Sequence, residues 1–341
     1  MWVIYEMSFH TFGRNKTNMA PVGFLESLSL GVLARRRLSV FVFHKVPEQP
    51  SAIDPHDLDL STFKQMLDFI ETRFKVLPLA DAIRSLKVGT LPGSSACITF
   101  DDGYADWATG ILPELARRNL HATFYIATGQ LGGTPLWHER VAHALSRPAL
   151  LRFDQPGLPP LCLNTLQDRQ QARILLEKFL KYQPLNVRDA FIERLEAEAG
   201  VVPGALPRLS VETLRNIHNA GLEVGAHTVN HPILTANDPA TARREIGEAR
   251  ETLAHCIGGP VTTFAYPNGR PGTDFSAEHI RMVRHAGFTS AVSSQFGAAD
   301  MHTSEFQIPR FTPWGPGVLR MSLQLGRNLL ARLRYLEEHQ D

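Results

Sequence analysis

Short runs of apolar residues alternate along the chain with longer segments in which apolar residues recur every three or four positions. The short runs are rich in β-branched and aromatic residues, which is typical of buried strands. We expect strands at residues 38–44, 94–100, 122–127, 222–227, 261–266, 288–294 and 306–311. The segments with helical spacing are residues 59–74, 105–120, 210–221, 239–258, 276–287 and 317–338. This alternation predicts an α/β fold with a mainly parallel sheet of about seven strands, which suits a closed barrel or a long open sheet.

The alternation stops between residues 131 and 209, directly after the third predicted strand. This stretch contains LWHERVAHAL, the proline-rich DQPGLPPLCL and two Arg- and Glu-rich helical patterns around 166–182 and 187–199. We therefore expect a helical insertion, or lid, on the face of the sheet where the strands end. The predicted organisation is a partly irregular N-terminal extension at 1–37, a barrel at 38–311 that includes the insertion at 131–209, and a C-terminal amphipathic helix at 312–341.

Composition and charge limit the kinds of partner and the cellular compartment that we expect for this protein. The chain has 35 basic and 34 acidic residues and a formal net charge of +1, so bulk charge does not indicate a nucleic-acid partner. Its 3 cysteines are widely spaced, which argues against a disulfide framework and fits a reducing compartment. No apolar run approaches membrane-spanning length. The N-terminal stretch FLESLSLGVLARRRL carries its basic residues after the apolar part, the reverse of a signal peptide, so we expect a cytoplasmic protein.

Polar, titratable side chains stand at the ends of several predicted strands. Because the carboxyl ends of all strands in a parallel barrel face the same mouth, such residues should converge there. They are His44, Asp101, Asp102, His227, His231 and Arg310. This convergence is the central prediction from the sequence.

Two adjacent carboxylates, Asp101 and Asp102, repel each other unless a positive charge lies near. His227 and His231 are four residues apart, so on a helical turn they would lie on one side and could bind one metal ion together with a carboxylate. Such a set suits Zn²⁺, and imidazole also tolerates Fe²⁺, Co²⁺ or Ni²⁺. One aspartate could then bind the ion, while the other deprotonates a metal-bound water that attacks a carbonyl carbon.

Each of these motifs also has a structural interpretation. Asp-Asp-Gly after a strand is often a turn or a helix cap. Among 14 histidines, one pair at this spacing could arise by chance, and His44 alone could be a structural histidine. The placement of all of them at strand ends facing one mouth favours a functional site.

Three segments carry a family resemblance: TFDDG at 99–103, HTVNH at 227–231 and FAYPNG at 264–269. In order and position they resemble the first three motifs of the polysaccharide deacetylases, the NodB-homology or carbohydrate esterase 4 family. The resemblance covers roughly residues 38–130 and 208–311. It implies a distorted (β/α)7 TIM-like barrel, here with a helical insertion after the third strand, and hydrolysis of the N-acetyl group of N-acetylglucosamine units.

The resemblance also implies roles for individual residues. Asp101 would be the general base, and Asp102, His227 and His231 the metal ligands. The backbone N–H of Asn268 would help to hold the tetrahedral oxyanion. We expect Tyr266 and Pro267 of the third motif to bind substrate.

The insertion could also contribute to substrate binding. Trp137, together with His138 and Tyr182, could stack on sugar rings as part of a lid. Equally, Leu136, Val141 and Leu145 in LWHERVAHAL have the spacing of an ordinary buried helix face, which we favour for most of this segment.

The sequence departs from the family pattern in two places. Many members have an arginine that opens the third motif and pairs with the base; here that position is Ala265. We hypothesise that Arg310, from the last strand, replaces it. The late motif with a catalytic histidine is absent, because the matching region reads FQIPRF. His44 is our candidate for the general acid, and the equally weighted alternative is that it only hydrogen-bonds Asp101 or the backbone of the site.

The sequence thus favours a metal-dependent hydrolase of N-acetylated amino-sugar glycans. The alternatives are hydrolysis of another small amide or imide on the same fold, and a glycan-binding module with a degraded site. Without an export signal, the substrate could be a glycan precursor, including a lipid-linked one that would bring peripheral contact with a membrane. The closing helix, with Leu and Arg together over 323–336, could lie on a membrane surface, but we favour a role in covering the barrel.

Overall fold

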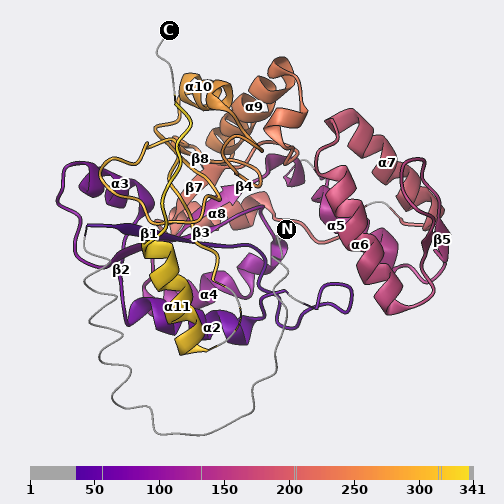
Figure 1. Ribbon diagram of the computed structural model, residues 1–341, viewed down its shortest axis with the longest axis horizontal. Coiled ribbons are helices and arrows are strands. Elements are labelled where there is room, and N and C mark those ends of the chain that lie inside the picture. The colour runs from indigo at the N-terminus through magenta and orange to yellow at the C-terminus, as the bar shows by residue number, and fades with distance from the viewer. Residues whose placement is uncertain are drawn as a thin grey trace, which may run out of the picture.

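The computed structural model describes residues 36–337 except residues 56, 132, 203, 205, 314 and 316. Six parallel strands form a curled sheet in the order β1-β3-β4-β7-β8-β9, and the short strand β2 pairs with β3. Their bounds are β1 Leu38–Phe43, β2 Lys75–Val76, β3 Ser95–Phe100, β4 Thr123–Ile126, β7 Glu223–Ala226, β8 Thr263–Ala265 and β9 Ser290–Val292. Helices surround the sheet (Figure 1), so the predicted distorted (β/α)7 barrel is confirmed. The extension predicted at 1–37 lies almost wholly outside the described residues.

The segment predicted as the last strand, 306–311, lies between β9 and β1. Ser293 N donates to Ile308 O at 2.8 Å on the β9 side, and Phe311 N donates to Val40 O at 2.7 Å on the β1 side. The segment is not a regular strand, which corrects the prediction. Pro309 lacks the N–H that a continuous ladder needs, so only isolated bridges form to the two neighbouring strands.

Helices lie around the sheet, and some of them have well-defined caps. The helices are α2 Leu60–Glu71, α3 Leu79–Lys87, α4 Ile111–Arg118, α8 Val211–Asn219, α9 Pro239–Ile257, α10 Ala277–His285 and α11 Val318–Leu329. The α9 helix is an example: Asp238 caps its first turn, Pro239 occupies its first position, and Gly258 ends it in the left-handed conformation with φ 67°. Within the described residues, every helix is too short or too polar to cross a bilayer.

Two helix predictions need correction, and one helix was missed. The segment 105–120 is broken into a 3₁₀ turn, Ala105–Ala108, and α4, because Gly110 lies between them as the N-terminal cap of α4. The closing helix ends at Leu329 instead of continuing to 338. The α3 helix was not predicted at all, although its buried face packs inside the fold.

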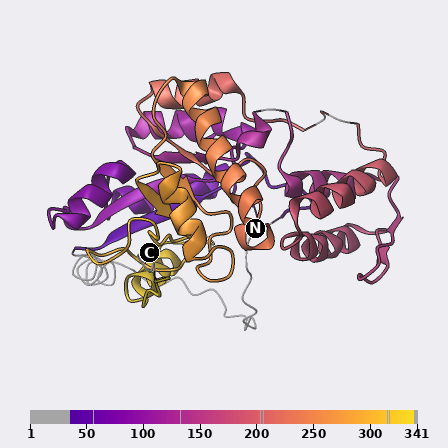
Figure 2. The same cartoon turned by 90° about the horizontal axis from the view of Figure 1, so that it is seen from above.

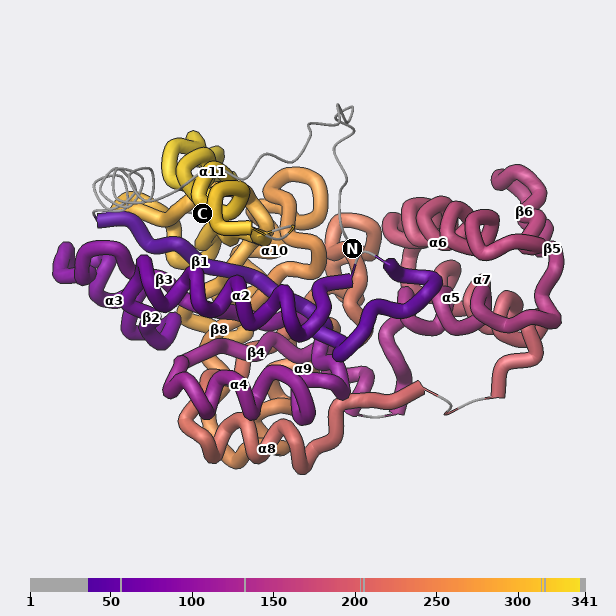
Figure 3. Tube along the Cα trace, turned by 90° about the horizontal axis from the view of Figure 1, so that it is seen from below, coloured from indigo at the N-terminus to yellow at the C-terminus, as the bar shows by residue number. Residues whose placement is uncertain are grey.

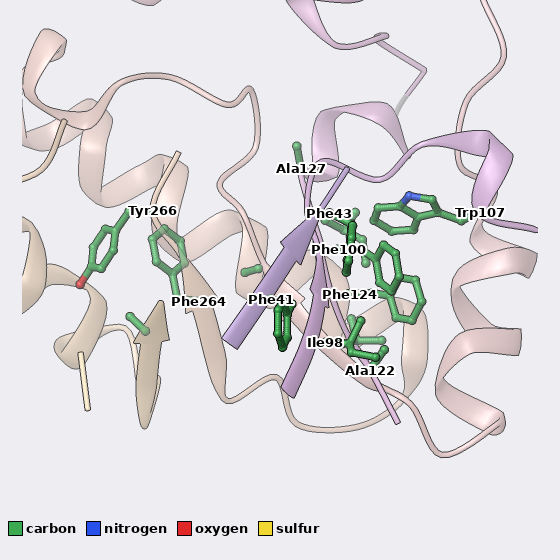
Figure 4. Packing of buried hydrophobic residues seen from close by; sticks show 14 of the residues in the cluster. Phe41, Phe43, Ile98, Phe100, Trp107, Ala122, Phe124, Ala127, Phe264 and Tyr266 are labelled. Carbon is green, nitrogen blue, oxygen red and sulfur yellow. The ribbon is translucent and has the colours of Figure 1, made fainter. Parts of the chain in front are cut away.

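The largest core lies between the outer face of the sheet and the helices. Side chains from β1, β3 and β4 meet there, and Phe100 stacks on Phe124 with ring centroids 4.9 Å apart (Figure 4). Trp107 is fully buried against Phe124, and its indole Nε1 donates to the carbonyl of His44 at 3.1 Å. This packing fixes the carboxyl end of β1, where the candidate site begins.

Alternate residues of the strands point to the inside of the barrel and form a second core. Val40, Cys97 and Tyr125 belong to it, together with the buried face of α3. The carboxylate of Glu223, at the start of β7, accepts hydrogen bonds from the first turn of α3, from Leu79 N at 2.8 Å and Ala80 N at 3.1 Å. The α3 helix therefore closes the end of the barrel where the strands begin, which leaves the opposite end for polar residues.

The stretch between β4 and β7 forms a separate lobe with its own core. It contains α5 Trp137–Ser146, β5 Arg152–Phe153, β6 Leu161–Cys162, α6 Leu166–Leu180 and α7 Leu185–Glu198. Figures 2 and 3 show this lobe at the end of the molecule farthest from α3. In these views the insertion lies at the end of the barrel where the strands finish.

Candidate active site

The two adjacent aspartates stand where β3 ends and the chain turns sharply. Asp101 N still donates to Phe43 O at 2.9 Å, which extends the pairing of β3 with β1 by one residue. Asp102 then has φ 88°, and Gly103 has φ 100°. The carbonyl of Asp102 is held by Ala127 N at 3.1 Å and by Gln130 Nε2 at 2.6 Å. Both carboxylates are buried, so they need compensating positive charge.

Arg310 supplies the positive charge for Asp101. Its two terminal nitrogens donate to the two carboxylate oxygens of Asp101 at 2.7 and 2.6 Å, and its Nε donates to Ser293 O at 3.0 Å. Burial would raise the pKa of Asp101, but Arg310 and then His227 outweigh it and hold the pKa below its usual range. The predicted pairing of Arg310 with Asp101 is confirmed.

The two histidines of HTVNH face Asp102, but not on a helical turn, so that part of the prediction is wrong. The chain after β7 is a loop in which Thr228 has φ 65° and His231 has φ 53°. This loop brings the two imidazole rings to a centroid distance of 4.7 Å. The Nε2 atoms of His227 and His231 lie 3.5 and 3.3 Å from Oδ1 of Asp102.

These three residues form a candidate metal site. One ligand atom from each of Asp102, His227 and His231 lies within 4.8 Å of the others, and no other such group was found in the described part of the chain. The Nδ1 of His227 contacts the carbonyl of Ala265 at 2.7 Å, so this nitrogen carries the proton and Nε2 is directed at Asp102. Within the described residues, the buried Oδ1 of Asp102 makes no well-directed hydrogen bond. A divalent cation would satisfy this donor set.

The electrostatics of the site agree with a bound cation. Burial lowers the pKa of His231 to about 3, so its ring is neutral and can donate a lone pair. Burial also acts to lower the pKa of His227, but Asp101 and Asp102 outweigh it and raise that pKa. Burial acts to raise the pKa of Asp102, and His231 and His227 outweigh it, so the pKa lies well below its usual range. A bound divalent cation would compensate the negative charge of Asp102 in place of these imidazoles.

His44 is half-buried at the end of β1, where the prediction placed it. Burial lowers its pKa to about 4, against the opposing effects of Asp102 and Asp101. Its ring is therefore neutral at pH 7. This favours a hydrogen-bonding role for His44 over the role of general acid, which needs a protonated ring.

The third motif forms a tight loop after β8. Asn268 has φ 55° and Gly269 has φ 69°, and a side chain at Gly269 would meet Ser294 N at 2.8 Å. Tyr266 is fully buried and stacks on Phe275 with ring centroids 3.8 Å apart, and Pro267 is buried beside it. The Tyr266 ring therefore packs in the outer core next to Phe264 (Figure 4), which corrects its prediction as a sugar-binding ring.

The prediction for Trp137 is also corrected. Its side chain is only 5% exposed, because it packs in the core of the insertion with the guanidinium of Arg188 5.3 Å above its ring. Tyr182 is 42% exposed, but its hydroxyl donates to Asp274 at 3.0 Å.

His138 is a residue of the insertion whose ring approaches the candidate site. Its ring centroid lies 6.2 Å from that of His231, and its Nε2 contacts the hydroxyl of Tyr104 at 2.8 Å. Tyr104 was missed from the sequence, although it directly follows the Asp-Asp-Gly turn and could have been included with that motif.

The histidine loop is held from two sides. On one side, the buried carboxylate of Glu245 in α9 accepts from Val229 N at 3.0 Å and from Asn230 N at 2.8 Å. On the other side, Arg188 of α7 donates to Asn230 O at 2.9 Å and to His231 O at 3.2 Å. Non-glycine residues with positive φ cost roughly 1–3 kcal/mol each, so this loop needs such support. Arg188 was not predicted, because an arginine in an Arg- and Glu-rich helix is normally solvated.

We predict that Arg188→Met weakens the binding of Zn²⁺ by about 10- to 100-fold, as is typical when groups that orient metal ligands are removed. Competition with a chromophoric chelator measures the affinity. Arg140→Met is the matched control, since Arg140 pairs with Glu196 inside the insertion at 2.6 Å and, among the described residues, has no hydrogen bond or ion pair to the histidine loop. Equal losses in the two variants, or no loss in Arg188→Met, would contradict this role of Arg188.

Comparison with known proteins identifies the family. The family model described as polysaccharide deacetylase matches residues 89–153 and 186–291, together half of the chain. The unmatched stretch between these ranges lies inside the insertion. A search of curated proteins found no match.

Three solved structures illustrate the similarity in fold. The Streptococcus pyogenes deacetylase PplD in complex with acetate has a TM-score of 0.57 at 15% identity, over 86% of this chain and 98% of that chain. IcaB from Ammonifex degensii has a TM-score of 0.55 at 16% identity, over 85% and 97% of the two chains. The de-N-acetylase from Aggregatibacter actinomycetemcomitans has a TM-score of 0.52 at 14% identity, over 84% and 99%. With half of its length matched by the family model, the chain belongs to the polysaccharide deacetylase family.

Proposed function

We propose that this protein is a metal-dependent hydrolase that removes N-acetyl groups from N-acetylglucosamine-type units of a polysaccharide or glycan precursor. The observation that carries the proposal is the meeting of Asp102, His227 and His231 beside Asp101, which is itself paired with Arg310. Membership of the polysaccharide deacetylase family supports a hydrolase that acts on glycans.

Asp102 Oδ1 and the Nε2 atoms of His227 and His231 would hold the ion. Zn²⁺ suits two imidazoles and a carboxylate best, and Co²⁺, Ni²⁺ or Fe²⁺ bind the same donors. When bound, the ion would polarise the acetyl carbonyl and lower the pKa of a water molecule.

Asp101 is the residue that we assign as general base. Arg310 occupies one lone pair of each carboxylate oxygen, so each oxygen keeps a second lone pair that can accept a proton from the attacking water. The same ion pair keeps Asp101 ionised before the reaction, because it lowers the pKa of the carboxyl group. The N–H of Asn268 is assigned to stabilise the oxyanion that forms on the acetyl group.

The amine nitrogen needs a proton when its bond to the acetyl carbon breaks. Asp101 holds a proton at this point, taken from the water, and can return it to the nitrogen, which balances the reaction to a free amine and acetic acid, which then ionises to acetate. His44 is neutral before the reaction, with a pKa of about 4. We therefore assign it a positioning role, through hydrogen bonding at the mouth of the barrel, and not the role of general acid. The candidate metal-binding and base residues are all present and adjacent, which does not favour a degraded glycan-binding module.

We predict that the Zn²⁺-loaded protein releases acetate from chitin oligomers and that a chelator abolishes this release. Asp101→Asn should reduce turnover by about 10²- to 10⁴-fold, the usual contribution of a general base, while bound metal stays normal. Enzymatic assay of acetate and metal analysis of the same samples provide the two readouts. Asp81→Asn, on the exposed surface of α3, is the control. Full turnover in Asp101→Asn would rule out Asp101 as the general base. A loaded wild type that is inactive on every acetylated sugar but cleaves another small amide would favour the alternative substrate class.

We predict that Arg310→Met lowers turnover without loss of metal and moves the acidic limb of the pH–rate profile to higher pH. The base must be ionised, and Arg310 lowers the pKa of Asp101, so removing this charge raises that pKa and activity is lost at a higher pH as the solution is acidified. Steady-state kinetics across pH test this, with Arg84→Met, an exposed arginine of α3, as control. An unchanged limb and unchanged turnover would remove Arg310 from the mechanism.

A further inference from the structure

The C-terminal helix α11 has two apolar faces. One face covers the barrel, as predicted, because Met321, Leu325 and Leu329 are buried in the main core. The other face carries leucines that this packing does not explain: Leu319 is 47% exposed, Leu323 62% and Leu330 66%. The spacing of four and seven residues places them on one stripe of the helix. Single exposed leucines are ordinary, whereas three on one stripe raise the question of what this face contacts.

The charges around this stripe have one sign. Arg320, Arg327, Arg332 and Arg334 are exposed in and directly after α11. Between Glu305 and Glu337 the sequence contains no acidic residue. The stripe is therefore accompanied by four guanidinium groups, in a segment that contains no acidic residue.

The basic segment after the helix is held in place on the barrel. Gln307 Nε2 donates to Leu336 O at 3.0 Å, and Leu336 N donates to Gln307 Oε1 at 2.9 Å. The hydroxyls of Thr303 and Tyr335 lie 2.8 Å apart. In Figure 1, α11 lies on the side of the barrel next to β1, away from the insertion, so the surface is presented apart from the candidate active site.

We propose that the exposed face of α11, from Leu319 to Arg334, docks on an anionic phospholipid surface. Leucines on one line of a helix with flanking arginines are the features with which amphipathic helices bind the interface of anionic bilayers. A second copy of the chain fits less well, because a two-fold contact through this face would bring its four arginines against the same four arginines. The inference goes beyond the proposed hydrolysis and does not depend on it.

The test is co-sedimentation of the full chain with vesicles. Vesicles of phosphatidylcholine with about a quarter phosphatidylglycerol should bind the protein at least about tenfold more tightly than pure phosphatidylcholine, and salt at about 0.5 M should weaken the binding. Leu319→Ser/Leu323→Ser should lose about tenfold or more of the affinity, and so should Arg327→Glu/Arg332→Glu. The control is Ile174→Ser/Val187→Ser, which changes two exposed apolar residues of the insertion.

Each result bears on the proposal. Absence of binding to anionic vesicles, equal binding to pure phosphatidylcholine, or equal effects of the α11 and control variants would overturn it. A concentration-dependent dimer in sedimentation velocity that Leu319→Ser/Leu323→Ser abolishes would overturn it in favour of a second copy. Acetate release from soluble chitin oligomers should be the same in the α11 variants and the wild type, so a failure of hydrolysis is distinguishable from a failure of docking.

Discussion

The structure at the mouth of the barrel depends on how two adjacent buried carboxylates are compensated. Asp101 is neutralised by a bidentate pair with Arg310, while Asp102 faces the two imidazoles of His227 and His231. The sharp turn at Asp102, with φ 88°, allows neighbours in sequence to have different partners. One carboxylate is thus held by a permanent cation, and the other by groups that can bind a metal ion. This division underlies the different roles that we propose for the two aspartates.

The second requirement is a loop that presents both histidines. It contains two residues with positive φ, Thr228 and His231, so its conformation needs support from its surroundings. Glu245 holds its N–H groups from the barrel side, and Arg188 holds its carbonyls from the insertion. The insertion is therefore connected to the chemistry of the site through the backbone of the histidine loop, and through His138 beside His231.

The barrel and the convergence of the site could be predicted from the sequence, because strand ends in a parallel barrel share one mouth. The partner of Asp101 could be predicted as well, because Ala265 stands where the family arginine would be and Arg310 lies in the last segment predicted as a strand. Other features depend on contacts distant in sequence. The histidine spacing suggested a helical turn, but the chain forms a loop that is supported by distant contacts, among them those of Glu245 and Arg188, each on a different helix. Trp137 and Tyr266 were expected to meet sugars, yet local patterns do not distinguish an aromatic ring at a mouth from one in a core.

The central claim is that Asp102, His227 and His231 bind a single divalent ion. Native mass spectrometry of the protein after exposure to Zn²⁺ and removal of free metal tests it most directly. We expect one ion per chain in the wild type and in His255→Ala, which changes an exposed histidine of α9, and none in Asp102→Asn/His231→Ala. An ion retained by the double variant, or a wild type that binds none, would contradict it.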